Sequence, residues 1–78
     1  NNKGLSLAKL GRHEEALELY DRAIQINPHY AVTYNNKGSS LAALGIYEEA
    51  LKFYDQAIQI NPKYVGAYNN KGFSLMIR

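Results

Sequence analysis

The chain has 78 residues, of which 46% are hydrophobic and 21% charged, a composition typical of a folded protein rather than a disordered one. Nine lysines and arginines against seven aspartates and glutamates give a net charge of +2, too small to indicate nucleic acid or an anionic membrane as partner. The absence of cysteine excludes disulfides, thiolate metal sites and cysteine nucleophiles, and no apolar run approaches the roughly 18 residues of a membrane span.

From its first residue the chain follows a pattern that recurs every 34 residues. NNKGLSLAKLGRHEEALELYDRAIQINPHYAVTY is followed by NNKGSSLAALGIYEEALKFYDQAIQINPKYVGAY and then by NNKGFSLMIR, and the first two blocks agree at 23 of 34 aligned positions. A period of this length predicts an array of stacked repeats rather than a single globular core.

Stop signals divide each block into two segments. Gly11 and Gly45 follow apolar stretches, where glycine can take the left-handed conformation that ends a helix. Asn27-Pro28 and Asn61-Pro62 end the next stretches, because proline lacks an N–H and clashes with the preceding turn. We therefore predict an all-α protein with helices over residues 1–10, 14–26, 31–44, 48–60 and 65–77. Connections of three or four residues make neighbouring helices antiparallel hairpins.

The apolar spacing indicates which faces are buried. The second helix of each block carries a stripe composed of Ala16, Leu17, Tyr20, Ala23 and Ile24, repeated as Ala50, Leu51, Tyr54, Ala57 and Ile58. Such a stripe packs against neighbouring helices. Gly4, Gly38 and Gly72 recur within the first helices, where a glycine costs about 0.5–1 kcal/mol relative to alanine. Three glycines at one repeat position predict close packing there.

Together these residues resemble the tetratricopeptide repeat, a helix–turn–helix unit of 34 residues. In the middle block the family's pattern is met by Tyr34, Gly38, Leu41, Ala50, Tyr54, Ala57 and Pro62. The other blocks match at Gly4, Leu7, Ala16, Tyr20, Ala23 and Pro28, and at Tyr68, Gly72 and Leu75. We expect the tyrosines at these positions to lie in the core. Lys3, Lys37 and Lys71 depart from the family, which usually has leucine there.

The resemblance implies a right-handed superhelical solenoid of stacked hairpins, in which the first helix of each repeat lines a concave groove. It divides the chain into a repeat over 1–30, truncated at its start, a complete repeat over 31–64, and the first helix of a third over 65–78. Because the chain also begins without Met, we expect a fragment of a longer array. Family members are typically scaffolds, so the resemblance implies a protein-interaction scaffold that binds a partner protein or extended peptide in the groove.

Asparagines dominate the positions that would face this groove. The candidate peptide-binding residues are Asn1, Asn2, Asn35, Asn36, Asn69 and Asn70, with Ser39 and Phe73 one turn further. An asparagine amide offers one acceptor and two donor hydrogens, which complements a peptide unit. The pattern resembles the asparagine ladder with which some superhelical members hold a peptide main chain, best at Asn2, Asn36 and Asn70. The alternative is that the asparagines cap helix starts or bond between repeats.

A second binding mode of the family is a two-carboxylate clamp for chaperone C-termini, which needs lysines and an arginine at specified groove positions. Only Asn36 matches that pattern, and Asn1, Gly66 and Asn70 occupy the expected basic sites. We therefore do not expect an acidic chaperone tail to bind. The lysine row at residues 3, 37 and 71 either steers an acidic partner or is simply solvated.

Other chemistry finds little support in the sequence. Glu14-Glu15 and Glu48-Glu49 fall at helix starts, where the helix dipole favours negative charge. His13 and His29 are not repeated in the next block and have no second ligand at suitable spacing, so no metal site is predicted. We find no nucleophile–base pair and no phosphate-binding loop, and hence predict no enzyme and no cofactor. An RNA-binding helical repeat is a further alternative, because pentatricopeptide arrays use similar hairpins. Those arrays favour a 35-residue period and a more basic groove, so the strict period of 34 and the net charge of +2 argue against RNA as the partner.

Self-association is an alternative function. The last helix carries Phe73, Leu75, Met76 and Ile77, whereas stable arrays usually end in a polar capping helix. Exposed apolar ends invite end-to-end stacking, and such heterologous contacts propagate. The partners that we predict are thus a protein or peptide, or a second copy through the terminal helices, and neither nucleic acid nor membrane. The location in the cell stays open, with the cytoplasm favoured.

Overall fold

A computed structural model describes residues 12–77 of the chain. Its helices are α2 (His13–Ile26), α3 (Ala31–Ala43), α4 (Tyr47–Ile60) and α5 (Val65–Ile77). The described part contains no β-strand, so the prediction of an all-α protein is confirmed. The bounds of these helices differ from the predicted ones by no more than one residue. The helix predicted over 1–10, together with Gly11, lies outside the described residues.

The turn between α3 and α4 ends the first helix of its repeat as predicted. Gly45 has a φ of 83°, the left-handed conformation that a side chain disfavours. Its N–H bonds the carbonyl of Ala42 at 3.0 Å, and the N–H of Ile46 bonds the carbonyl of Leu41 at 2.9 Å. These two bonds satisfy carbonyls that the end of a helix leaves unpaired.

The connections after α2 and α4 share one construction. The backbone N–H of Asn27 bonds the last turn of α2, and its Oδ1 accepts a hydrogen bond of 3.2 Å from the N–H of His29. Asn61 bonds the last turn of α4 in the same way, and its Oδ1 accepts from the N–H of Lys63, also at 3.2 Å. The proline that follows each asparagine therefore sits in a turn stabilised by a side chain.

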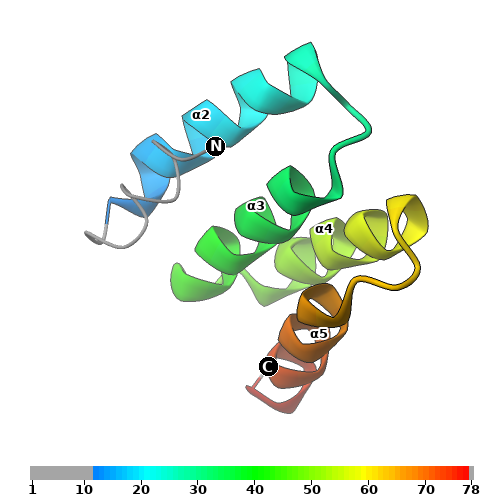
Figure 1. Cartoon of the computed structure of the whole chain (residues 1–78). Helices are drawn as coiled ribbons and strands as arrows, with labels where there is room; N and C mark the ends of the chain where they lie inside the picture. Colours follow the sequence, from blue (N-terminus) through cyan, green and yellow to red (C-terminus); the bar gives the residue numbers. More distant parts are fainter. Residues whose placement is uncertain (1–11, 78) are drawn as a thin grey trace.

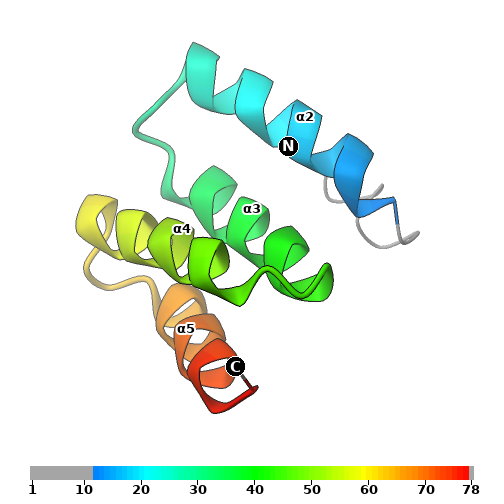
Figure 2. The same ribbon diagram turned by 180° about the vertical axis from the view of Figure 1, so that it is seen from behind.

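The helices stand in a row. Helix α3 packs against α2, α4 and α5, and α4 packs against α5. Figures 1 and 2 show α2 and α5 on opposite sides of the antiparallel α3–α4 hairpin. Each helix thus packs mainly against the helices next to it in the chain, with a smaller contact between α3 and α5, and the four do not surround a common centre. This is the arrangement of a helical repeat solenoid.

Small residues and two tyrosines fill the space between the helices. Tyr20 of α2 is fully buried and Tyr54 of α4 is 2% exposed, which confirms that they belong to the core. The Tyr54 ring packs directly against the backbone of α3 at Gly38. The alanines with no exposed surface are Ala16, Ala50, Ala57 and Ala67. Alanine at these positions lets the helices approach each other closely around the tyrosine rings.

The two other pattern tyrosines are less buried than predicted. Tyr34 is half-buried, stacks on Phe53 with 6.4 Å between the ring centres, and donates a hydrogen bond of 2.8 Å to the carbonyl of Pro28. Tyr68, at the same position of α5, is 50% exposed, so its assignment to the core is wrong. The reason is that no described helix lies against α5 as α4 lies against α3.

Ion pairs join each repeat to the next. Lys37 of α3 pairs with Asp21 of α2, and Lys71 of α5 pairs with Asp55 of α4 at 2.6 Å. The ammonium of Lys37 also lies 4.3 Å from the centre of the Phe53 ring, within cation–π range. These two lysines are therefore neither simply solvated nor unpaired charges for a partner. Lys3 lies outside the described residues.

Candidate functional site

A cavity of about 370 Å³ lies between α3 and α5, with α4 contributing two tyrosines to its wall. We call it the α3–α5 cavity. It is lined by Ser39, Ala42, Ala43, Tyr47, Tyr54, Asn70, Phe73, Ser74 and Ile77. The structure thus brings Ser39, Asn70 and Phe73, three of the candidate peptide-binding residues, to one surface.

The repeat explains why these side chains converge. Ser39 and Phe73 occupy the same repeat position on α3 and α5, and those two helices contact each other. Phe73 is 63% exposed, so most of its ring is available to a ligand. With Ile77 it gives the cavity an apolar wall, beside the polar groups of Asn70 and Ser39. An apolar lining with a few convergent polar groups is typical of a ligand-binding cavity.

The side chain of Asn70 is held by two residues of α3. Its Nδ2 donates to Oδ1 of Asn35 at 3.0 Å and to the hydroxyl of Ser39 at 3.4 Å. Asn35 in turn donates through its own Nδ2 to the hydroxyl of Tyr64, at 3.3 Å. These four residues form a polar network that crosses from the second repeat to the third. Bonding between repeats, the alternative that the sequence left open, therefore occurs at both asparagines.

The asparagines differ in their access to a ligand. Asn35 is only 8% exposed and lies between the repeats rather than on the open surface. Asn70 is half-buried and combines the bond between repeats with a place in the cavity wall. Asn36 is half-buried and Asn69 exposed, and neither lines the α3–α5 cavity. Asn1 and Asn2 lie outside the described residues.

The α3–α5 cavity has no charge in its wall. The described residues that line it are all uncharged. The lysines of the two helices that form it, Lys37 and Lys71, are paired with aspartates of the preceding helices. The expected basic positions of a carboxylate clamp hold Gly66 and Asn70 in this part of the chain. The cavity therefore offers no local positive field to attract a carboxylate.

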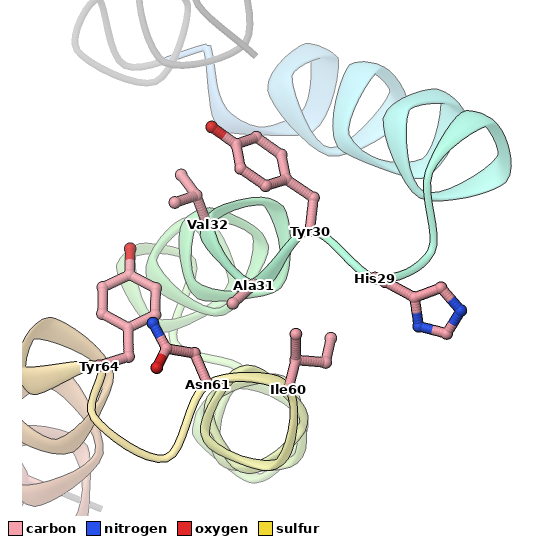
Figure 3. Close-up of a pocket in the computed structure, with 7 residues that line it drawn as sticks. All are labelled: His29, Tyr30, Ala31, Val32, Ile60, Asn61 and Tyr64. Atoms are coloured by element: carbon pink, nitrogen blue, oxygen red, sulfur yellow. The ribbon is translucent and has the colours of Figure 1, made fainter.

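Another cavity, of about 340 Å³, lies between the connections that precede α3 and α5 (Figure 3). Its lining is formed by His29, Tyr30, Ala31, Val32, Ile60, Asn61 and Tyr64. We call it the turn cavity. In Figure 3 the imidazole of His29 points away from Asn61 and Tyr64, so these polar groups do not converge. None of the candidate peptide-binding residues lines it.

Sequence reasoning missed Tyr64, which lines the turn cavity and accepts the hydrogen bond from Asn35. The available signal was its recurrence, since Tyr30 stands at the same position of the preceding block. A tyrosine can contribute apolar surface with its ring and hydrogen-bond with its hydroxyl, which is how Tyr64 is used here.

Residues 12–77 hold neither a candidate metal site nor a candidate membrane span. No group of three histidines, aspartates or glutamates lies close enough there to hold a metal ion. None of the helices in this range has both the length and the apolar character needed to cross a lipid bilayer. Burial raises the pKa of the Tyr20 phenol, and the neighbouring Ser40 hydroxyl lowers that pKa by a smaller amount. Tyr20 lies on α2 beside Ser40 of α3, and it does not line the α3–α5 cavity.

Comparison with known proteins connects this arrangement to one family. A family model described as tetratricopeptide repeat matches residues 1–63, which is most of the chain. A search of curated proteins found no match.

Several solved structures are similar to the chain. The second TPR of Spaghetti (RPAP3) bound to the HSP90 peptide SRMEEVD is 29% identical, with a TM-score of 0.93 over 96% of this chain and 69% of that one. The second TPR domain of human RPAP3 in complex with the HSP70 peptide SGPTIEEVD is 30% identical, with a TM-score of 0.88 over 94% of this chain and 61% of that one.

The Sgt2 TPR domain from Aspergillus fumigatus is 24% identical, with a TM-score of 0.91 over 96% of this chain and 50% of that one. At this identity the likeness shows the fold alone. The chain spans between 50% and 69% of the length of these three structures.

Proposed function

We propose that this chain, which belongs to the tetratricopeptide repeat family, is a protein-interaction scaffold that binds an extended segment of a partner protein in the α3–α5 cavity. Similar structures hold peptides, which supports the scaffold function. The observation that carries the choice of site is the convergence of Ser39, Asn70 and Phe73, from two neighbouring repeats, on one cavity. We also propose that the repeats divide at residues 31 and 65, where α3 and α5 begin.

The dimensions suit an extended peptide. Packed helices lie about 8–10 Å apart, and an extended chain rises about 3.3 Å per residue. A peptide that crosses α3 and α5 therefore presents about every third residue to a helix of the groove. We propose that Asn70, which lines the cavity, bonds a peptide unit and that Phe73, also in the lining, contacts an apolar side chain of the same segment.

The proposed partner differs from those of the similar structures, whose peptides end in EEVD. The α3–α5 cavity has uncharged walls, and the lysines of its helices are paired with aspartates. We therefore propose a partner segment without an acidic tail. The proposed function is binding alone. It includes no catalytic activity, cofactor, nucleic acid or membrane, because binding of a peptide by this surface requires none of them.

Selection from a random peptide library tests the proposal. Dodecapeptides displayed on phage are selected against the 78-residue protein. The affinity of each selected peptide is then measured for the wild type and for variants whose fold has been verified by circular dichroism. Phe73→Ala and Asn70→Ala should each weaken binding about fivefold or more, since truncation of an anchor costs at least ~1 kcal/mol. His29→Ala, in the turn cavity, is the matched control and should bind as the wild type does. Equal binding to all three variants, or no selected peptide, would contradict the proposed function.

A further inference from the structure

We infer that the exposed face of α5 is a docking site for an amphipathic helix of another protein, one that carries two aromatic residues between a pair of alanines. We call this surface the α5 docking face, and its residues are Val65, Tyr68, Gly72, Leu75 and Met76. Successive residues point about 100° apart around a helix, so the α5 docking face lies on a different side of α5 from Asn70, Phe73 and Ile77, which line the α3–α5 cavity. The inference therefore goes beyond the proposed function.

One repeat earlier, the same face of α3 is covered by α4. Its five residues, at the same repeat positions, are Ala31, Tyr34, Gly38, Leu41 and Ala42. In that contact Leu41 packs against Ala50 and Tyr54 of α4 and is 4% exposed. Leu75, its counterpart on α5, is 50% exposed, because no helix within residues 12–77 lies against α5 as α4 lies against α3. The α5 docking face is thus one half of a contact whose other half is present in the same molecule.

Gly72 leaves room for an aromatic ring on this face. On α3 the ring of Tyr54 lies so close to Gly38 that a Cβ there would be 2.6 Å from Cε1 of the ring. A Cβ on Gly72 would have no neighbouring atom within 4 Å. Glycine inside a helix is less favourable than alanine, and the described residues make no use of the space that it leaves at Gly72. A docked helix therefore places an aromatic ring over Gly72, as α4 does over Gly38.

The α5 docking face also offers contacts for a second aromatic ring. Phe53 of α4 stacks on Tyr34, with 6.4 Å between the ring centres. The ammonium of Lys37 lies 4.3 Å from the centre of the same Phe53 ring. On α5 the counterparts of these two partners are Tyr68, which is 50% exposed, and Lys71, whose side chain is 37% exposed. The docked helix therefore has the order Ala-x-x-aromatic-aromatic-x-x-Ala, which residues 50–57 have in α4.

A second copy of this chain is the poorer occupant. The two helices that carry the pair of alanines are α2 and α4, and their central tyrosines, Tyr20 and Tyr54, are 0% and 2% exposed. To offer either helix, the second copy would have to open its own helix packing. What it has exposed is another α5, which lacks the pair of alanines that allows a close approach. The occupant is therefore a helix of a partner protein, and association between two α5 helices is the weaker alternative.

The first experiment offers the protein a synthetic helix with the sequence of α4, acetyl-YEEALKFYDQAIQI-amide. A lactam joins the counterparts of Glu48 and Lys52, which lie four residues apart and are exposed in α4, so that the free peptide is already helical. In the ¹⁵N-labelled 78-residue protein, we expect the peptide to shift the NMR amide signals of Tyr68, Gly72 and Leu75. The counterparts on α3 should keep their signals, because the tethered α4 covers them at an effective concentration on the order of millimolar.

One comparison of peptides tests the aromatic residues. The same lactam peptide with alanine in place of both aromatic residues should bind about tenfold more weakly, because the two anchors of the contact are lost.

Two variants of the protein test the space over Gly72. Gly72→Ala fills that space with a methyl group and should weaken binding of the aromatic peptide about tenfold, while circular dichroism shows the helices intact. Gly66→Ala adds the same methyl group to α5 at a position about 120° away around the helix, and this variant should bind the peptide as the wild type does. A general effect of alanine in α5 would not separate these two variants.

The outcomes separate the inference from the proposed function. The inference is overturned if the aromatic peptide leaves the signals of the α5 docking face unchanged, or if Gly72→Ala and Gly66→Ala bind this peptide equally well. It is also overturned, in favour of a second copy, if those signals move with protein concentration and a saturating amount of peptide leaves the mean mass in sedimentation velocity unchanged. Extended peptides selected from the phage library should bind Gly72→Ala as they bind the wild type, so the proposed function stands or falls on its own test.

Discussion

Gly38 and Tyr54 are in such close contact that no side chain fits between them. A Cβ atom on Gly38 would lie 2.6 Å from Cε1 and 2.8 Å from Cδ1 of Tyr54. Gly72 occupies the same repeat position on α5, and a Cβ there would have no neighbouring atom within 4 Å. The repeat thus places glycine at both sites, but only the site that faces a tyrosine ring requires it.

The two glycines should respond to alanine in opposite directions. We expect Gly38→Ala to lower the free energy of unfolding by about 1–3 kcal/mol, because the methyl group displaces the Tyr54 ring. Gly72→Ala should raise it by about 0.5–1 kcal/mol, because alanine is the better helix former and the space is open. Urea unfolding of both variants beside the wild type measures the difference. A loss of equal size at both positions would contradict the packing described here.

Tyr20 should make stability depend on alkaline pH. Its pKa is raised by burial, so the unfolded chain, with a phenol pKa near 10, loses this proton first as pH rises. The contribution of the protonated phenol is therefore complete below about pH 10 and is lost as pH rises through the folded-state pKa. We expect the stability of the wild type relative to Tyr20→Phe to fall above that pH. The two proteins share every other residue, so their urea midpoints are compared at each pH. A difference that stays constant to pH 11 would refute this prediction.

The two inter-repeat ion pairs should differ in strength. Lys37 has a side chain 17% exposed and lies over Phe53, whereas the Lys71 side chain is 37% exposed. Double-mutant cycles with Asp21→Asn and Lys37→Met should give a coupling of about 1 kcal/mol, the upper end for pairs at the surface. The cycle with Asp55→Asn and Lys71→Met serves as the matched comparison and should give less, with greater loss in 1 M salt. Equal couplings and equal salt dependence would argue against a role for burial.

The exposed face of α5 should promote self-association. Leu75 is 50% and Met76 83% exposed, while Leu41, the counterpart of Leu75 on α3, is 4% exposed. Sedimentation velocity should show a mean mass that rises with protein concentration, and Met76→Glu should reduce the rise. Ile26→Glu is the control, because Ile26 is 85% exposed but lies on α2. A monomer at every concentration, or equal effects of the two substitutions, would speak against association through α5.

The helix bounds were predictable because their signals are local. Gly45 ends α3 through its own backbone conformation. Asn27 and Asn61 each close a turn by accepting, at the side-chain oxygen, a hydrogen bond from the backbone N–H two residues further along the chain. The period predicted that Ser39 and Phe73 would share a surface, since they are one repeat apart. Both inferences need only neighbouring residues or a fixed translation along the array.

What could not be predicted depends on how neighbouring helices face each other. Asn35 and Asn36 are adjacent in sequence, but successive residues point about 100° apart around a helix, so only Asn35 reaches Asn70. The repeat gives Tyr68 the same pattern position as Tyr34, whereas its burial depends on which helix lies next to α5. The pairing of Asp21 with Lys37 likewise joins residues that sequence spacing alone does not bring together.

The asparagine-closed turns after α2 and α4 have a mechanical consequence. Because both turns are made by the same bonds, each hairpin leaves its predecessor in a similar direction, and any small tilt set there is added again at every repeat. In a chain of many such units, a change in the backbone conformation of one turn would move the far end of the array by a large distance, while each hairpin kept its internal structure. The four residues at each junction would thus act as a hinge between rigid hairpins.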